Sequence, residues 1–216
     1  MEAILPAKSL VDRTYEALLD AICTGEFRPG DRVGQDEVAE RLNVSRQPVN
    51  SAIAMLKAQR FVMETGRRGV VVAPVDQSLF ESIYEFRSAV EPLAVELATG
   101  KLTPDAIAKG RGIVRRGTSL MHAGDAKGVL QADIDFHTLI YQLSGNEIIF
   151  DTMRLNWGHL RRSMGEVLRF PGMTLTVWKE HKAIFETMVS GDGSEAAALM
   201  RQHIVDAPRR LKSPPG

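Results

Sequence analysis

Hydrophobic residues recur every three or four positions along most of the chain, which is the spacing of helices that bury one face. After residue 76, breakers interrupt this pattern at TGKLTPD, HAGD, SGN, RFPGM and SGDGS. The segments between the breakers predict six helices, over about residues 77–99, 105–122, 125–143, 147–168, 174–190 and 194–211. Short connections between successive helices predict an antiparallel six-helix bundle.

The first helix of this bundle has a regular apolar stripe, and the pattern assigns it to the bundle interior. Its members are Leu79, Ile83, Phe86, Val90, Leu93 and Leu97.

The first 74 residues have a different organisation, with three short helices followed by two strands. Ser9 can cap the first helix, and Asp12 resembles the partner residue of a capping box. The breaker FRPGDRV separates it from QDEVAERLN and from VSRQPVNSAIAMLKAQR, which predict the next two helices. FVMETGRRGVVVAP predicts a strand, a glycine-bounded turn and a strand. The chain is therefore predicted to be mainly α, with a winged helix-turn-helix domain over 1–74 and a helical domain over 75–216.

The third helix is predicted to be the recognition helix of this winged domain. Its buried stripe is Val49, Ile53 and Leu56, which leaves polar residues near its start on the outer face. Arginine pairs with guanine in the major groove, whereas asparagine and glutamine pair with adenine. The arginines of the predicted wing can reach phosphates or the minor groove. The predicted DNA-binding residues are Ser45, Arg46, Gln47, Asn50, Arg67 and Arg68.

The net charge of the whole chain gives no indication of function, because 27 basic and 27 acidic residues cancel. The local distribution of charge does. Between Arg41 and Gly69 there are six basic residues, and Glu64 is the only acidic one. A basic face attracts phosphate whatever the overall charge. The alternative is a helical domain with a solvated basic face.

The segment PGDRVGQDEVAERLNVSRQPVNSAIAMLKAQRFVMETGRRGVVVAP resembles the DNA-binding domain of the GntR transcription regulators. The resemblance covers residues 29–72 and includes the V-S-R-x-P-V core of the family's recognition helix. Asn50 and Ser51 replace the family's usual Arg-Glu, which implies a different operator sequence. Arg60 and Phe61 replace the usual Gly-Leu, which we interpret as a packing change.

The stretch ADIDFHTLIY places a carboxylate and an imidazole on a helix that otherwise looks buried. Asp133 and His137 are four residues apart and share one helix face with Leu130, Ile134 and Tyr141. Two explanations fit this pattern. One is a core histidine with its hydrogen-bond partner, and the other is a metal site.

The second half of the chain, from Asp76 to about Pro208, resembles the FCD domain of the FadR branch of the GntR family. The resemblance rests on YEFRSAVEPLAVELA, ADIDFHTLIYQLSGNEII and WKEHKAIFETMVSGDGSEAAALMRQHI, and six helices suggest the VanR-like subgroup. It implies a divalent metal bound by Asp133, His137, His181 and His203. Zinc is the first choice, and nickel, manganese or iron also suit these ligands.

An organic acid effector is the ligand that the resemblance implies. Family members often use an arginine on the first bundle helix for this purpose, and Arg87 matches it. The alternative role for Arg87 is a helical ion pair with Glu91, and the two roles can coexist. Asn156 and Arg161 are further candidate effector contacts on a helix that is predicted to face the pocket. His122 and His159 match nothing, and we expect them at the surface or the pocket edge.

The function predicted from these features is a homodimeric or larger repressor that binds double-stranded operator DNA under control of a small carboxylate. One alternative is a regulator that senses the metal ion directly. Another is a metalloenzyme fused to a DNA-binding module, although the chain has no H-E-x-x-H motif and no obvious general base. We predict that the chain is not an enzyme.

The compartment predicted from the sequence is the cytoplasm. Cys23 is the only cysteine, so no intrachain disulfide is possible. No apolar run reaches the roughly 18 residues that a membrane helix needs. The first residues lack the pattern of a secretory signal.

Overall fold

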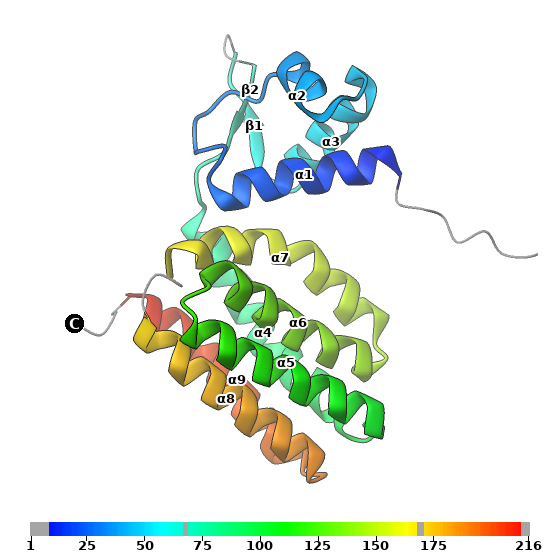
Figure 1. The fold of residues 1–216 in the computed structure, drawn as a ribbon, viewed down its shortest axis with the longest axis vertical. Helices are drawn as coiled ribbons and strands as arrows, with labels where there is room; N and C mark the ends of the chain where they lie inside the picture. Colours follow the sequence, from blue (N-terminus) through cyan, green and yellow to red (C-terminus); the bar gives the residue numbers. More distant parts are fainter. Residues whose placement is uncertain (1–8, 67–68, 168–170, 213–216) are drawn as a thin grey trace, which may run out of the picture. The chain divides into compact units, whose positions relative to one another are not determined.

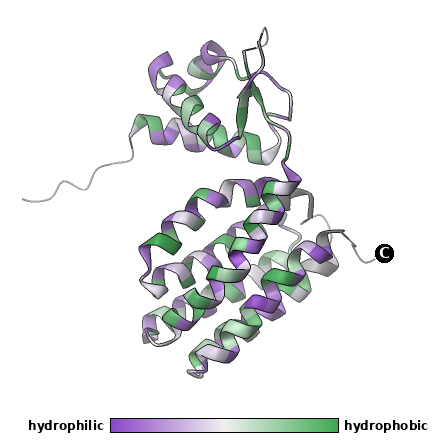
Figure 2. Cartoon of the chain, turned by 180° about the vertical axis from the view of Figure 1, so that it is seen from behind, coloured by the Kyte–Doolittle hydropathy of each residue, from purple (hydrophilic) through white to green (hydrophobic). Residues whose placement is uncertain are grey.

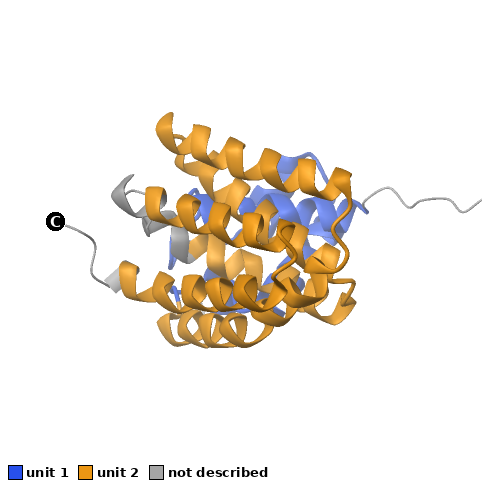
Figure 3. Ribbon diagram, turned by 90° about the horizontal axis from the view of Figure 1, so that it is seen from below, with its two compact units in different colours: residues 1–75 blue, residues 76–216 orange. Residues whose placement is uncertain are grey.

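The computed structural model describes the backbone of residues 9–66, 69–167 and 171–212. Side chains are described in the same ranges except for residues 163–174 and 211–212. The chain divides into two compact units, residues 1–75 and 76–216, which Figure 3 shows in different colours. The prediction of a mainly helical protein with a winged N-terminal domain is confirmed, since the described part contains helices and a single two-stranded sheet.

Unit 1 consists of three helices and a short hairpin (Figure 1). They are α1 (Leu10–Thr24), α2 (Gln35–Leu42), α3 (Arg46–Ala58), β1 (Val62–Glu64) and β2 (Val70–Val72). The two strands are antiparallel, with Val62 opposite Val72, and Arg32 adds a bridge to Val71. Each helix packs an apolar face into one core.

Two helix starts in unit 1 are capped to different degrees. Ser9 and Asp12 form the capping box at α1, each accepting a hydrogen bond from the other's backbone N–H. Ser45 is the N-cap residue of α3, but its side chain makes no capping hydrogen bond. The Ser45 hydroxyl is exposed and is not used to start the helix.

Arg60, which joins α3 to β1, corrects one interpretation of the sequence. Its φ is 60°, in the left-handed region that disfavours residues with a Cβ atom. The exchange of glycine for arginine at this position therefore affects the backbone and is not merely a packing change.

We predict that Arg60→Gly raises the free energy of unfolding of unit 1 by about 1 kcal/mol, because glycine adopts this φ without steric cost. Hydrogen exchange of the unit 1 amides measures this change. Asn43→Gly is the matched control, since Asn43 has a φ of 51° but asparagine already tolerates it. An equal gain in both variants would contradict the argument.

Unit 2 is a bundle of helices that run back and forth along one direction (Figure 1). They are α4 (Gln77–Thr99), α5 (Pro104–His122), α6 (Ala126–Ser144), α7 (Glu147–Val167), α8 (Pro171–Val189) and α9 (Gly193–Lys212). The α4 helix packs against α6, α7, α8 and α9 and is the central helix of this core. Hydrophobic and hydrophilic stretches alternate along each helix (Figure 2). No helix in the described part combines the length and apolarity needed to cross a membrane.

The orientation of α4 contradicts part of the sequence prediction. Three members of the stripe that was assigned to the interior are exposed, namely Phe86 (40%), Leu93 (45%) and Leu97 (37%). The face of α4 that packs into the core instead has polar residues at its centre, namely the buried Arg87 and Glu91. The prediction was wrong because it assigned the most apolar face of α4 to the interior. The face that is buried instead contains polar groups that are paired with residues of other helices.

Pro92 lies inside α4, one residue after Glu91. Proline has no N–H group, so the carbonyl of Ser88 loses the hydrogen bond that a regular helix would give it. Arg201 of α9 donates a hydrogen bond to this carbonyl at 2.9 Å. The hydrogen bond from Arg201 therefore replaces the one that Pro92 cannot donate. It also links α4 to α9.

Two glycines of α5 allow α8 to pack closely. A Cβ atom on Gly110 would lie 1.9 Å from the Phe185 ring, and one on Gly117 would lie 2.0 Å from the Trp178 ring. The two glycines are seven residues apart on α5, and the two rings are seven residues apart on α8. Both aromatic rings therefore pack directly on the α5 backbone. This packing fixes α8, which contains His181.

Gly117→Ala is expected to lower the free energy of unfolding of unit 2 by about 1–3 kcal/mol, because the added methyl group displaces a buried indole. Urea unfolding followed by tryptophan fluorescence measures this change, since both tryptophans lie in unit 2. Gly112→Ala on the same helix is the control. Its Cβ would meet only Arg115 at 4.0 Å, so the better helix propensity of alanine should stabilise it.

Candidate functional sites

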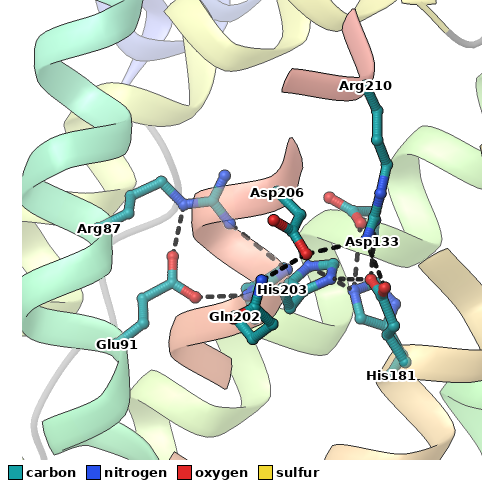
Figure 4. A network of polar contacts seen from close by, with 10 residues as sticks. Arg87, Glu91, Asp133, His181, Gln202, His203, Asp206 and Arg210 are labelled. Atoms are coloured by element: carbon teal, nitrogen blue, oxygen red, sulfur yellow. Dashed lines mark hydrogen bonds and ion pairs between the residues drawn. The ribbon is translucent and has the colours of Figure 1, made fainter. Parts of the chain in front are cut away.

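Three histidines from three helices meet in the core of unit 2. Figure 4 labels two of them, His181 and His203. His137 lies on α6, His181 on α8 and His203 on α9, with exposed fractions of 0%, 0% and 4%. One ring nitrogen from each lies within 4.8 Å of those of the other two. Helical spacing places each of them on an apolar face, so burial of these faces brings the imidazoles together.

Carboxylates hold two of the three rings from the outside. The Nδ1 atom of His137 lies 2.7 Å from Glu91 Oε2, and the Nδ1 atom of His203 lies 2.8 Å from Glu180 Oε2. An ionised carboxylate only accepts hydrogen bonds, so each Nδ1 is the protonated nitrogen. The Nε2 lone pairs of both rings therefore lie on the inner side, where that of His137 accepts a hydrogen bond from Arg87 at 3.4 Å. Rings whose outer nitrogen is held by a carboxylate are typical of metal-binding histidines.

His181 completes the group from the opposite side. Its Nε2 lies 3.2 Å from His203 Nε2 and 3.5 Å from Asp133 Oδ1. Two lone pairs cannot face each other at this distance, so a proton or a cation must lie between the rings. The Nδ1 of His181 is buried and has no hydrogen-bond partner among the described residues.

Two of the three histidines, His181 and His203, have a lowered pKa that favours the neutral form. Burial lowers the pKa of His181 well below its usual value, and the nearby His203 and His137 lower it further. Burial also lowers the pKa of His203, although its hydrogen bond to Glu180 acts in the opposite direction. Neutral imidazole is the form that binds metal ions.

A buried ion pair adjoins the histidines. Arg87 is 2% exposed, and its Nε donates to Glu91 Oε1 at 2.5 Å. One terminal nitrogen of Arg87 lies 3.4 Å from His137 Nε2, and Tyr141 donates its hydroxyl to Glu91 at 2.7 Å. The helical ion pair considered from the sequence is therefore present, and it is desolvated in the core.

The environment of this pair keeps it charged. Burial acts to raise the pKa of Glu91, but the Arg87 guanidinium and His137 outweigh it and hold that pKa below its ordinary value. Two aromatic rings enclose the guanidinium carbon of Arg87, with the Tyr84 centroid at 4.9 Å and the Trp157 centroid at 5.5 Å. Burial raises the pKa of Tyr84 to about 12, so this ring remains neutral.

The remaining candidates have other interactions or lie at the surface. Asn156 is half-buried on α7 and donates its side-chain amide to the Thr152 carbonyl of the same helix at 2.8 Å. Arg161 and His159 are half-buried on α7 and have further interactions. His122 is exposed at the end of α5. From α7, it is the Trp157 ring that reaches the cluster, at 5.9 Å from the His137 ring.

Sequence reasoning missed Glu180 and Arg210, and it named Tyr141 only as part of an apolar helix face. Glu180 directly precedes His181, so helical periodicity places it on another face, and only the packing of α9 brings it to His203. Arg210 forms a two-pronged pair with Glu180 from the last turn of α9. The WKEH stretch was a possible signal, because it places an acid next to a predicted ligand.

The α3 surface of unit 1 exposes Ser45, Arg46, Gln47 and Asn50 together near the start of the helix. Both basic residues on this helix have acidic neighbours. Arg46 pairs with Asp36 of α2, and Lys57 pairs with Glu64 of β1 at 2.6 Å. The predicted wing residues Arg67 and Arg68 lie outside the described residues.

Comparison with known proteins gives matches over both units. The profile of bacterial regulatory proteins of the gntR family matches residues 10–72, and that of the FCD domain matches residues 82–206. The Nta operon transcriptional regulator of Aminobacter aminovorans is 31% identical over 82% of this chain and 83% of its own length. The HTH-type transcriptional repressor GlaR of Escherichia coli is 26% identical over 88% and 90%.

Solved structures give the same result for the fold. The structure described as E. coli McbR/YncC superimposes with a TM-score of 0.84 over 95% of this chain and 98% of that one, at 19% identity.

Proposed function

Because the chain belongs to the GntR family of bacterial transcription regulators and has an FCD domain, we propose that it is a repressor controlled by a small organic acid. Its relatives are transcription regulators and not enzymes, so the metalloenzyme alternative is set aside. The observation that carries the proposal is the buried histidine cluster beside Arg87, in a unit separate from the exposed α3 surface. The chain would act on DNA in the cytoplasm.

Operator recognition is assigned to the exposed start of α3, together with the wing arginines Arg67 and Arg68. Arg46, Gln47 and Asn50 offer the groups that read base edges, and Ser45 can reach a phosphate. Regulators of this family typically bind operator DNA as dimers, so a homodimer on a two-fold operator is proposed.

Arg46→Ala is expected to weaken operator binding by about 10- to 100-fold, because it removes the arginine at the start of the recognition helix. Fluorescence anisotropy with an operator selected from random DNA measures this effect. Arg209→Ala is the matched control, since it removes an exposed arginine of unit 2. Unchanged affinity in Arg46→Ala would contradict the assignment of α3 as the recognition helix.

The metal would be held by His137, His181 and His203, with Asp133 as the fourth ligand. The residues present fit a divalent ion, because three buried imidazoles converge in the core and two have their outer nitrogens fixed by carboxylates. Zinc is proposed first, and nickel, manganese or iron also suit this donor set. When bound, the ion would supply positive charge that attracts a carboxylate.

The effector is proposed to be a small carboxylate that binds between the ion and Arg87. Its remaining atoms would extend toward α7, where Asn156 and Arg161 are candidate contacts. Native mass spectrometry of the purified protein tests this arrangement. The expected species contains one ion per chain and an added small acid that is lost on chelation. A metal-free chain that still binds the acid would overturn it.

Direct metal sensing is the second candidate, and the cluster favours it because the ion itself could order three helices. It predicts an operator affinity that follows the free metal concentration without any organic acid. An ion that does not exchange on the timescale of the assay would exclude this role.

A further inference from the structure

An acidic residue of α2 contacts the arginine at the start of α3. Asp36 is the second residue of α2, and Arg46 is the first residue of α3. An ion pair joins Oδ1 of Asp36 to Nε of Arg46, and the two side chains are 71% and 72% exposed. An ion pair with this exposure contributes little to folding, so stabilisation of unit 1 does not account for it.

A carboxylate next to a DNA-binding surface is unfavourable in general, because it repels phosphate. The α2 helix has three exposed acids, namely Asp36, Glu37 and Glu40. Of these three, Asp36 is the one that forms an ion pair with a residue of α3 in the described part of the chain. Its charge therefore acts on a residue that is proposed to read a base.

The atom of Arg46 that Asp36 contacts matters for base recognition. Guanine presents O6 and N7 side by side in the major groove, and an arginine binds both with two neighbouring N–H groups. The ion pair occupies Nε and leaves the terminal nitrogens of the guanidinium for such a contact. A side chain that is already held in place also loses less conformational freedom when it binds.

We propose that Asp36 is a positioning residue for operator recognition. It holds the Arg46 guanidinium so that the terminal nitrogens bind O6 and N7 of one guanine in each operator half-site. The inference rests on the proposed function, because it requires that the start of α3 enters the major groove. It goes further by naming the base that Arg46 reads and a second residue, on another helix, that selects it.

The test measures base preference position by position. An operator is selected from random DNA with the wild-type chain, and each position is then replaced by the other three bases. The wild type should favour guanine at one position of each half-site by roughly 10- to 100-fold. Asp36→Ala should lower this preference by roughly tenfold and leave the other positions unchanged. Fluorescence anisotropy measures the affinities.

Three further variants separate positioning from other roles of an acid in α2. Glu37→Ala is the matched control, because it removes the same charge from the same first turn, where either acid can stabilise the helix. It should leave every base preference unchanged. Asp36→Asn should restore part of the guanine preference, since its amide oxygen can still accept the N–H of Nε. Asp36→Ala combined with Arg46→Ala should discriminate no less than Arg46→Ala alone, because Asp36 acts only through Arg46.

The outcomes separate the role of Asp36 from the proposed function. A uniform rise in affinity for all sequences, equal in Asp36→Ala and Glu37→Ala, would show general repulsion of phosphate and would overturn the inference. A wild-type chain that selects an operator, with a guanine preference that Asp36→Ala leaves intact, would overturn only the role of Asp36. A folded wild-type chain that selects no sequence would contradict the proposed function itself, and the inference with it. Circular dichroism establishes that each variant is folded.

Discussion

Removal of the proposed divalent ion is expected to lower the melting temperature of unit 2 by about 10 °C. An ion present at 1,000 times its dissociation constant stabilises the folded state by about 4 kcal/mol, and each kcal/mol shifts the melting temperature by about 2–4 °C. The physical reason is that the three imidazoles lose the cation on which their lone pairs converge. Differential scanning fluorimetry of the protein in zinc, and again after chelation, measures this shift.

His181→Ala should abolish the zinc-dependent part of the melting temperature, whereas His122→Ala should retain it because His122 is exposed and outside the cluster. Intrinsic fluorescence adds a local readout. Trp178 lies 4.9 Å from the His181 ring, and Trp157 lies 5.9 Å from the His137 ring. A paramagnetic ion such as nickel should therefore quench emission in the wild type. Equal zinc shifts in both histidine variants would contradict this site.

The elements of the fold could be predicted from local signals in the sequence. The predicted helix over 77–99 has the same bounds as α4, because Asp76 caps its start and the TGK breaker follows its end. The winged domain could be predicted in the same way, from caps, a proline–glycine turn and a glycine-bounded hairpin. The set of three histidines was implied by the resemblance to the FCD domain, and each of them lies on the apolar face of its own helix.

Tertiary partners could not be predicted in this way. The inner face of α4 has a charged pair at its centre, and no single-helix pattern indicates that His137 and Tyr141 of α6 will satisfy it. Glu180 reaches His203 only through the packing of α8 against α9. The φ of Arg60 is set by the turn between α3 and β1, which sequence reasoning treated as ordinary side-chain packing.

Glu91→Ala is expected to lower the free energy of unfolding of unit 2 by about 3–5 kcal/mol, one of the largest effects of any single substitution in the chain. The change leaves the Arg87 guanidinium buried without a counter-charge. It also removes the hydrogen-bond partner of His137 Nδ1 and of the Tyr141 hydroxyl. Urea unfolding followed by tryptophan fluorescence measures the loss, because Trp157 contacts Arg87.

Two comparisons separate the buried charge from a general loss of packing. Arg111→Ala breaks an ion pair with Glu186 in which both side chains are at least 40% exposed, so it should leave unit 2 stability unchanged within error. The double variant Arg87→Met, Glu91→Leu removes both charges and should recover a large part of the loss, because no uncompensated ion remains. A double variant as unstable as Glu91→Ala would show that hydrogen bonds to His137 and Tyr141 dominate. In that case Glu91 stabilises the unit mainly by orienting the His137 ring toward the other two histidines, and zinc binding should weaken together with stability.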